Sequence, residues 1–374
     1  MRQSPLRILH VVTSLEPGGM ENGVVNLARH LNPDQFSVHV CCLERAGAFQ
    51  ERLPAATKVS VLGKGAGFSV KTVVDLARLI GRTKPHLIHT HNLGPLIYSG
   101  LASVWGAWRP ILHGEHAQLN NEELTPKRLR QRTVFFRACR RVHTVSHALR
   151  DHLIRLGFPG RKIEVVSNGV DAERFSPGPR EAARRRLGLP VDAVVAGVVG
   201  RFGPFKRHNL LIEVFTRLAH ERANFHLLVV GGGGAEQDRV TQQACASAAA
   251  DRIHLVGFQQ ETAPCYQAMD LLVVPSINEG LSNALLEGMA CGVPALCHEA
   301  CGNGEVVAQG EDGFVFDLAE PDELSRRLQE ALADPARLRE MGRQARAKVL
   351  ARFSLEVMVR NYERLYRELA CPVR

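Results

Sequence analysis

The sequence predicts an α/β protein built from two doubly wound, Rossmann-like domains. Three observations support this prediction: a length of 374 residues, short apolar runs that alternate with longer helix-like segments, and a Pro- and Gly-rich break near the middle. A chain of this length exceeds what one hydrophobic core usually supports. Continuous apolar strands separated by helices are typical of parallel sheets that are covered on both faces.

The expected strands form two series, one in each half of the chain. In the first half the apolar runs are residues 6–12, 38–43, 59–62, 87–90, 111–113, 142–145 and 163–166. In the second half they are residues 194–199, 225–230, 253–256, 271–274 and 294–297. The segments between most of these runs are long enough for the crossover helices that parallel strands need.

The break at residues 175–179 reads Phe-Ser-Pro-Gly-Pro, which can continue neither a strand nor a helix. A charged helix over residues 180–187 is expected to follow it. We therefore predict an N-terminal domain of residues 1–178 and a C-terminal domain of residues 179–354. Apolar residues fall on one helical face of the last segment, which predicts a helix in residues 355–374 that returns to the N-terminal domain.

The net charge of +9 indicates an anionic partner, which the charge alone leaves open among nucleic acid, a membrane surface and a phosphorylated small molecule. The nine cysteines form no Cys-x-x-Cys pair, and no histidine spacing completes a zinc pattern, so we expect no metal site. This cysteine usage is typical of a reducing compartment. No run is long enough to span a membrane or to serve as a signal peptide. We expect a cytoplasmic protein, or one that lies peripherally at the inner face of the membrane.

Two glycine-containing loops follow expected strands and precede expected helices. After the first strand come Gly18 and Gly19, which could cradle a phosphate at the start of a helix, although a tight loop explains them equally well. The spacing is not Gly-x-Gly-x-x-Gly, which disfavours a nicotinamide site. In the second half, Arg201 and Lys206 lie between a strand and a helix, where two cations suit a diphosphate better than they suit a solvated loop.

A run of four glycines, residues 231–234, directly follows the strand at residues 225–230. Glycine lowers stability unless the backbone needs room. We therefore expect a ligand or the other domain to approach this loop closely.

The most informative segment is residues 274–294, which predicts a strand end, a glycine turn, a helix and a Gly-Val-Pro entry into the next strand. Glu279 precedes the expected helix, and Glu287 lies two turns along it. The turn at Gly280 and the backbone N–H groups of the helix start can hold an anion, and the two carboxylates can accept hydrogen bonds from sugar hydroxyls. The N–H groups expected to point at the anion are those of Leu281, Ser282 and Asn283.

The chain resembles the retaining family 4 glycosyltransferases, which have the GT-B fold of two Rossmann-like domains facing a cleft. The resemblance extends over essentially the whole chain. It rests on the glutamates 279 and 287, the loop at residues 18–21, the string Ser-Asn-Gly-Val-Asp-Ala-Glu-Arg-Phe at residues 167–175, and the pair Arg201 and Lys206. The His-Gly-Glu-His string at residues 113–116 also resembles an exopolysaccharide-biosynthesis branch.

This resemblance implies a role for each site residue. Glu279 would hold hydroxyls of the donor sugar and Glu287 the ribose, while Arg201 and Lys206 would neutralise the diphosphate. Family members usually lack the Asp-x-Asp metal motif, and this chain has none. The resemblance therefore implies a metal-independent enzyme without a cofactor. A donor phosphate oxygen would take the acceptor proton.

A histidine of the N-terminal domain commonly lines the donor site in this family. The candidates are His113 and His116, and we favour His116. The chain departs from the family pattern at Arg207, where many relatives have Gly, and at Gly288, where Ala is usual. The first departure would change the charge near the diphosphate, and the second would only weaken a helix slightly.

Residues 124–150 hold a cluster of basic residues around Val134, Phe135 and Phe136, with no acidic residue before position 151. A basic helix with aromatic residues can lie on an anionic membrane, and a solvated helix with its Phe residues in the core is equally consistent. The basic residues are Lys127, Arg128, Arg130, Arg132, Arg137, Arg140 and Arg141.

Taken together, these features predict a retaining hexosyltransferase. Its partners would be a nucleoside diphosphate sugar as donor, a sugar or lipid-linked saccharide as acceptor, and the membrane surface. One alternative is a nucleotide-sugar 2-epimerase of the same fold. Another is a basic nucleic-acid-binding protein, which the absence of a recognised nucleic-acid module disfavours.

Overall fold

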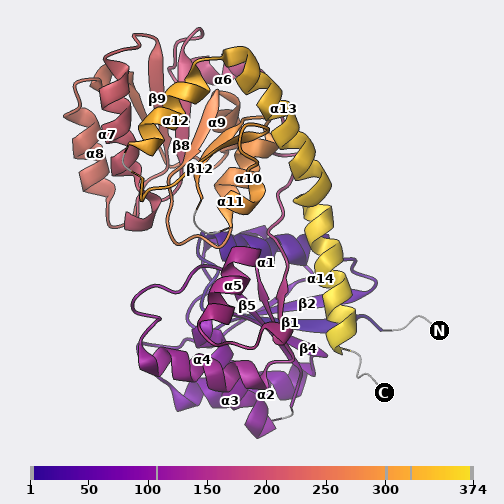
Figure 1. The fold of residues 1–374 in the computed structure, drawn as a ribbon. Coiled ribbons are helices and arrows are strands. Elements are labelled where there is room, and N and C mark those ends of the chain that lie inside the picture. Colours follow the sequence, from indigo (N-terminus) through magenta and orange to yellow (C-terminus); the bar gives the residue numbers. More distant parts are fainter. Residues whose placement is uncertain (1–3, 107, 300–301, 321, 371–374) are drawn as a thin grey trace. The chain divides into compact units, whose positions relative to one another are not determined.

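The computed structural model describes residues 4–106, 108–299, 302–320 and 322–370 (Figure 1). The chain divides into two compact units: unit 1 comprises Met1–Gly169 with Leu355–Arg374, and unit 2 comprises Val170–Ser354. The division falls at Val170 rather than at the predicted residue 179. The physical reason is that Val170 donates its N–H to the Phe353 carbonyl and forms a parallel bridge with Ser354.

Unit 1 holds a parallel sheet with the strand order β3-β2-β1-β4-β5-β6-β7. The strands are β1 (Leu6–Val12), β2 (Phe36–Cys42), β3 (Lys58–Val61), β4 (Leu87–His91), β5 (Ile111–Glu115), β6 (Arg141–Thr144) and β7 (Ile163–Val165). The helices are α1 (Gly19–His30), α2 (Val70–Thr83), α3 (Leu93–Gly106), α4 (Pro126–Ala138), α5 (His147–Arg155) and α14 (Leu355–Ala370), with short 3-10 turns at η1 (Ala48–Arg52) and η2 (Gly160–Lys162).

Helices cover the sheet of unit 1 on both faces. On one face, α2, α3 and α4 pack side by side over a core that includes Leu76, Ile88 and Phe136 (Figure 1). On the other face, α14 lies against α1 and buries Tyr362, Leu365 and further apolar residues against β1, β4 and β5. The C-terminal helix therefore completes the core of unit 1.

Unit 2 holds a second parallel sheet with the order β10-β9-β8-β11-β12-β13. Its strands are β8 (Val194–Val199), β9 (Phe225–Val230), β10 (Ile253–Gly257), β11 (Leu271–Val274), β12 (Ala295–His298) and β13 (Gly313–Phe316). Its helices are α6 (Arg180–Arg186), α7 (His208–Ala219), α8 (Gln237–Cys245), α9 (Ala263–Gln267), α10 (Asn283–Ala290), α11 (Asn303–Val306), α12 (Glu323–Leu332) and α13 (Pro335–Arg352), with 3-10 turns at η3 (Pro204–Lys206) and η4 (Ala250–Arg252).

The strand β13 was not among the predicted strands, although its Gly-Phe-Val-Phe sequence is apolar. It pairs with β12 in parallel register from Ala295–Gly313 to His298–Phe316. Its Phe314 and Phe316 are buried in the core of unit 2 beneath α12. All the predicted strands are present, and the two parallel sheets covered by helices confirm the predicted fold class.

Local sequence signals fix where several helices begin. Asp334 caps α13, because its carboxylate accepts hydrogen bonds from the N–H groups of Ala336 and Arg337, with Pro335 at the first helical position. Ser69 caps α2 and Ser146 caps α5 in the same way. These caps satisfy N–H groups that a helix start otherwise leaves unpaired.

Candidate functional site

Lys206 and Glu279 form an ion pair at the switch point of unit 2, where the strand order reverses between β8 and β11. Lys206 closes the turn that follows β8, and Glu279 lies on the loop that follows β11. In doubly wound folds, ligands bind outside the carboxyl ends of the strands at this place. The structure therefore brings together two residues that lie 73 positions apart in the sequence.

The Glu279 carboxylate is ionised in this setting. Burial opposes its ionisation, but the Lys206 ammonium and hydrogen bonds from Lys206, Ser276 and Ser282 outweigh burial and hold the pKa below its usual value. Only 14% of the Glu279 side chain is exposed, against 31% of the Lys206 side chain. A ligand that approaches from solvent would thus meet the ammonium more readily than the carboxylate.

The loop at Gly200–Gly203 lies directly against the four-glycine loop. Gly200 donates its N–H to the Val230 carbonyl and Phe202 donates to Gly233. A Cβ on Gly231 would meet the Gly200 carbonyl oxygen at 1.9 Å, and a Cβ on Gly234 would meet the Phe202 carbonyl oxygen at 2.5 Å. The run of glycines therefore makes room for the neighbouring loop of the same unit, which differs from our expectation of a ligand or the other domain.

Arg201 is exposed on this loop, and its Cγ lies beside Gly234. The aliphatic part of Lys206 runs over Gly200, where an added Cβ would lie 3.6 Å from the Lys206 Cε. Both predicted diphosphate ligands thus belong to the short segment between β8 and α7.

The start of α10 differs from the predicted one. The helix begins at Asn283, so Glu279 lies four residues before it and Glu287 one turn inside it, instead of two turns along. The Ser282 N–H donates to the Asn303 side chain at 3.0 Å, so it is engaged within the protein and does not point at an anion. The Ser282 hydroxyl instead donates to Glu279. Gly280 is held by a hydrogen bond from Gly302, and the Leu281 side chain is buried.

Glu287 is oriented by a tyrosine that the sequence analysis did not identify. The buried Tyr266 donates its hydroxyl to Glu287 Oε2 at 2.8 Å, and burial raises the pKa of this tyrosine well above its usual value. Gly288 makes this arrangement possible, because a Cβ there would meet Leu272 Cδ2 at 2.5 Å and Tyr266 at 3.3 Å. Gly288 is therefore a packing requirement, where we expected only a weaker helix.

Arg207 adopts a left-handed backbone conformation with φ of 56° immediately before α7. This conformation costs a non-glycine residue about 1–2 kcal/mol. Glycine would adopt this conformation without that cost. Arg207 places a further exposed cation one residue after Lys206.

Phe258 is an exposed aromatic residue at the carboxyl end of β10, which the sequence analysis also missed. Its side chain is 77% exposed, and its N–H lies 3.8 Å from where a Cβ on Gly232 would be. An aromatic ring at this edge offers a planar face to a nucleobase. The signal in the sequence was the pair Gly257-Phe258 directly after an apolar run.

In unit 1, the predicted phosphate loop at Gly18 and Gly19 holds a carboxylate instead. A Cβ on Gly18 would meet Glu21 Oε2 at 2.3 Å, so the Glu21 side chain folds back over this glycine at the start of α1. A negative charge at a helix N-terminus occupies the place that an anion would use. The Glu21 side chain therefore explains the glycine at position 18, and the phosphate contact at Gly18 and Gly19 stays a prediction.

His113 and His116 lie in different surroundings. His113 is fully buried, between Thr90 at 2.9 Å and Glu115 at 3.2 Å. His116 is half-buried just after the carboxyl end of β5, and its Nε2 lies 3.0 Å from His91 Nδ1. His113 is thus enclosed in the core, whereas His116 lies at the carboxyl edge of the sheet, where doubly wound folds bind ligands.

Glu115 and Arg132 form a buried ion pair beside His113, with 2.9 Å between Arg132 Nε and Glu115 Oε1. Arg132 also reaches Glu123 at 2.7 Å. Burial disfavours the charged form of Glu115, but His113 and Arg132 outweigh burial and lower its pKa to about 2. Arg132 is therefore part of the core, and the prediction that it belongs to an exposed basic cluster is wrong.

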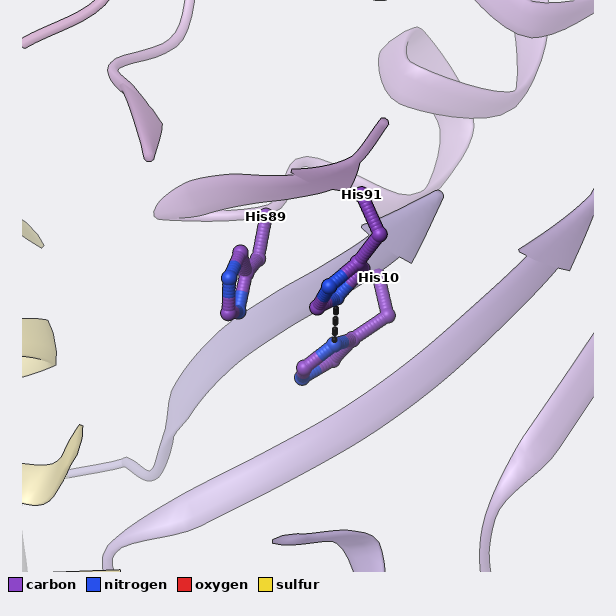
Figure 2. Close-up of side chains that lie close together, drawn as sticks. All are labelled: His10, His89 and His91. Carbon is purple, nitrogen blue, oxygen red and sulfur yellow. Dashed lines mark hydrogen bonds between the residues drawn. The ribbon is translucent and has the colours of Figure 1, made fainter. Parts of the chain in front are cut away.

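Five buried or half-buried histidines gather on one face of the sheet in unit 1. His10 lies in β1, His89 and His91 lie in β4, His143 lies in β6 and His116 follows β5. Figure 2 shows His10 beneath His91, with 3.1 Å between His10 Nδ1 and His91 Nε2. Burial lowers the pKa of all five, to about 3 for His10 and to about 4 for His116, so the cluster is neutral at pH 7.

Comparisons with known proteins agree with this architecture. Residues 17–174 match the family model described as Glycosyltransferase Family 4, and residues 179–348 match the one described as Glycosyl transferases group 1. The chain is 22% identical to Anabaena Alr3699/HepE, solved in complex with UDP-glucose, with a TM-score of 0.86 over 97% of this chain and 100% of that chain. It is 23% identical to sucrose-phosphate synthase from Thermosynechococcus elongatus, with a TM-score of 0.82 over 97% and 99% of the two chains. These structures share the fold.

Two sequence relatives are named D-inositol 3-phosphate glycosyltransferase. The chain is 29% identical to the protein from Streptomyces bingchenggensis over 371 residues, which covers 89% of this chain and 81% of that protein. It is 34% identical to the protein from Gordonia bronchialis over 223 residues, 56% of this chain, and there it spans about half (48%) of the relative's length. The two family models span most of the chain, and the chain is a family 4-like glycosyltransferase.

Proposed function

We propose that the protein transfers a hexosyl group from a nucleoside diphosphate sugar to an acceptor hydroxyl, with retention of the anomeric configuration. The observation that carries this proposal is the Lys206–Glu279 pair at the switch point of unit 2. An ammonium suits the diphosphate, and a carboxylate suits the hydroxyls of a neutral sugar. The known structure of Alr3699/HepE with UDP-glucose makes UDP-glucose the first donor to test.

In this proposal, different residues of unit 2 bind different parts of the donor. Lys206 and Arg201 bind the diphosphate, Glu279 binds sugar hydroxyls and Glu287, held by Tyr266, binds the ribose. Phe258 stacks on the base. For unit 1, the family resemblance and its position at the edge of the sheet support a role for His116 in the reaction.

The proposed chemistry needs no residue as a nucleophile. The acceptor oxygen bonds to the anomeric carbon while the bond from that carbon to the phosphate oxygen breaks. The electron pair of the broken bond goes to the departing diphosphate, and a phosphate oxygen takes the acceptor proton. Lys206 and Arg201 stabilise the charge that develops on the leaving group, which is the task that a metal ion performs in other transferases.

The acceptor is proposed to be a sugar or a lipid-linked saccharide, in assembly of cell-surface or exopolysaccharide material. The names of the relatives add D-inositol 3-phosphate as an acceptor to be tested beside it. Because both family models are glycosyltransferase models, transfer is favoured over 2-epimerisation and over nucleic-acid binding.

A donor should raise the melting temperature of the protein, because a ligand that binds only the folded state stabilises it. We expect UDP-glucose or another nucleoside diphosphate sugar to do so equally well with and without added Mg²⁺ or Mn²⁺. A donor at 100 times its dissociation constant stabilises by about 2.7 kcal/mol. A thermal-shift panel of nucleotide sugars measures this effect. A shift that appears only with the divalent ion would contradict charge neutralisation by Lys206 and Arg201.

We also propose that unit 1 contacts the membrane surface peripherally. In the described residues, no helix is both long and apolar enough to pass through a bilayer. In α4, Phe136 lies in the core and the Phe135 ring packs against Gly100 of α3. The aromatic residues of α4 therefore do not face solvent, as the membrane-bound alternative requires. The exposed aromatic residues of unit 1 include Trp105, 66% exposed near the end of α3, and Trp108, 65% exposed. Tryptophan beside basic residues is typical of membrane-interface surfaces.

Replacing Lys127, Arg130 and Arg137 by Gln should reduce sedimentation with anionic liposomes. All three side chains are exposed, and each basic residue near such a surface contributes about 1 kcal/mol. Arg132 is left intact because it is buried and paired. The control replaces three exposed arginines of unit 2, Arg185, Arg217 and Arg326, which changes the net charge equally. The proposed membrane contact through α4 would be excluded by an equal loss of sedimentation in both variants. It would also be excluded if the unmodified protein did not sediment with the liposomes at low salt.

A further inference from the structure

Three histidines of unit 1 converge from three neighbouring strands at the carboxyl edge of the sheet. His91 ends β4, His116 follows β5 and His143 lies in β6. Each offers one ring nitrogen, and these three atoms lie within 4.8 Å of one another. Imidazole nitrogens are preferred ligands of Zn²⁺, Cu²⁺ and Ni²⁺. We propose that His91, His116 and His143 bind a divalent transition-metal ion of the Zn²⁺ class.

Gly114 provides the space in which the ligand nitrogens meet. It stands between His91 and His143 in the sheet, because His91 pairs with Gly114 and Gly114 pairs with His143. A Cβ on Gly114 would lie 2.5 Å from His143 Nε2 and 2.8 Å from His116 Nε2. A side chain of any other residue at position 114 would therefore occupy the place of the two ring nitrogens. The glycine leaves a cradle for them on the face of β5.

Two further residues hold the outer nitrogens of the ligands. His91 Nε2 lies 3.1 Å from His10 Nδ1, and the hydroxyl of Tyr362 on α14 lies 3.4 Å from His143 Nδ1. Figure 2 shows the first of these contacts, with His10 and His91 from adjacent strands. Metal-bound histidines usually hydrogen-bond through the other ring nitrogen, which fixes the tautomer and the ring orientation. Both His91 and His143 have such a partner.

In the structure, the ligand nitrogens pair with other imidazoles. His91 Nδ1 lies 3.0 Å from His116 Nε2, and His143 Nε2 lies 2.9 Å from His89 Nε2. A tetrahedral ion with bonds of about 2.0–2.1 Å holds its ligand nitrogens about 3.3 Å apart. The His91 and His116 nitrogens are thus within a few tenths of an ångström of this separation, whereas His143, whose nitrogen lies within 4.8 Å of theirs, would turn its ring from His89 toward the ion. His89 would release His143 and keep its 2.8 Å hydrogen bond to Tyr366.

The neighbouring triad of His10, His89 and His91 also has nitrogens within 4.8 Å of one another, but it is completely buried. His116 is half-buried, which gives an ion a route from solvent to the triad at the edge of the sheet. Three neutral ligands leave a fourth position for water or another oxygen ligand, as in catalytic zinc sites. The expectation of no metal site concerned spacing in the sequence, which cannot show ligands that strands bring together.

The test is a titration of the full-length protein with Co²⁺, which reports a four-coordinate site through its visible absorption. The protein is first stripped with a chelator and dialysed. We expect one Co²⁺ per chain, displaced by Zn²⁺. Gly114→Ala, which keeps every histidine, and His143→Phe should each abolish the absorption. Tyr362→Phe should weaken binding by about 10–100-fold, as loss of an outer partner does.

The matched control removes the histidine pair of unit 2, His226 and His254, whose ring nitrogens lie 3.0 Å apart. The control variant should bind Co²⁺ as the unmodified protein does. Circular dichroism and thermal melting establish that each variant folds. An unmodified protein without the Co²⁺ absorption would overturn the proposal, whether or not the variants fold. So would absorption that persists in folded His143→Phe or that disappears in the control.

Discussion

Lys206→Gln is expected to lower kcat for sugar transfer by about 10²–10³-fold, the usual effect of removing one group that stabilises developing charge. The diphosphate leaving group gains negative charge as its bond to the sugar breaks. Lys206 is the cation that the fold holds at the switch point of unit 2, through its ion pair with Glu279. Initial rates of nucleoside diphosphate release with a saturating donor measure the effect.

Two matched variants separate this role from a general loss of charge. Arg207→Gly removes an exposed cation from the next position and relieves its left-handed backbone, so it should fold well and retain most activity. Lys206→Arg keeps the charge and should recover part of the rate. If Lys206→Gln and Arg207→Gly slow the reaction equally, Lys206 has no specific place at the diphosphate.

Glu287→Ala is expected to weaken binding of the bare nucleoside diphosphate by about 10-fold or more, because a hydrogen bond to a charged group contributes about 1.5–3 kcal/mol. Glu279→Ala should leave that binding nearly unchanged and slow transfer instead. Glu279 contacts the sugar in our proposal, and its removal leaves the charge of Lys206 in place for the diphosphate. Calorimetric titration with UDP, compared with transfer rates, measures both effects.

Tyr266→Phe provides the intermediate case for this experiment. It removes the 2.8 Å hydrogen bond that orients Glu287 but keeps the carboxylate, so it should weaken diphosphate binding less than Glu287→Ala does. Equal weakening of UDP binding by Glu279→Ala and Glu287→Ala would contradict the division between sugar and ribose. The two glutamates would then form one shared nucleotide site.

Much of the fold was predictable because its signals are local. A buried parallel strand is an apolar run, which is visible in the sequence. The strand β13 escaped prediction although it carries such a run. The division of the units at Val170 involves pairing with Ser354, far away in the sequence, and does not fall at the Pro- and Gly-rich segment of residues 175–179. Long-range pairing leaves no local pattern.

The sequence predicted the charged residues of the candidate site, but it did not predict the residues that hydrogen-bond to them. Arg201, Lys206, Glu279 and Glu287 have residue types that suit a nucleotide sugar at loop positions after strands. The partners that orient them come from distant elements, as Tyr266 does for Glu287 and Asn303 does for the Ser282 N–H. The histidines of unit 1 show the same limit, because only the strand order places β4, β5 and β6 side by side.

The position of α14 has a consequence for synthesis on the ribosome. Unit 2 is one continuous stretch of chain, so it can close its core as soon as its last residues leave the exit tunnel. Unit 1 starts first but must wait for Leu355–Ala370, which is made after the whole of unit 2, to cover the face of its sheet. Until then that face, with His10, His89 and His143, lacks the cover of Tyr362 and Tyr366. The half of the protein that is translated first is therefore the half that finishes folding last.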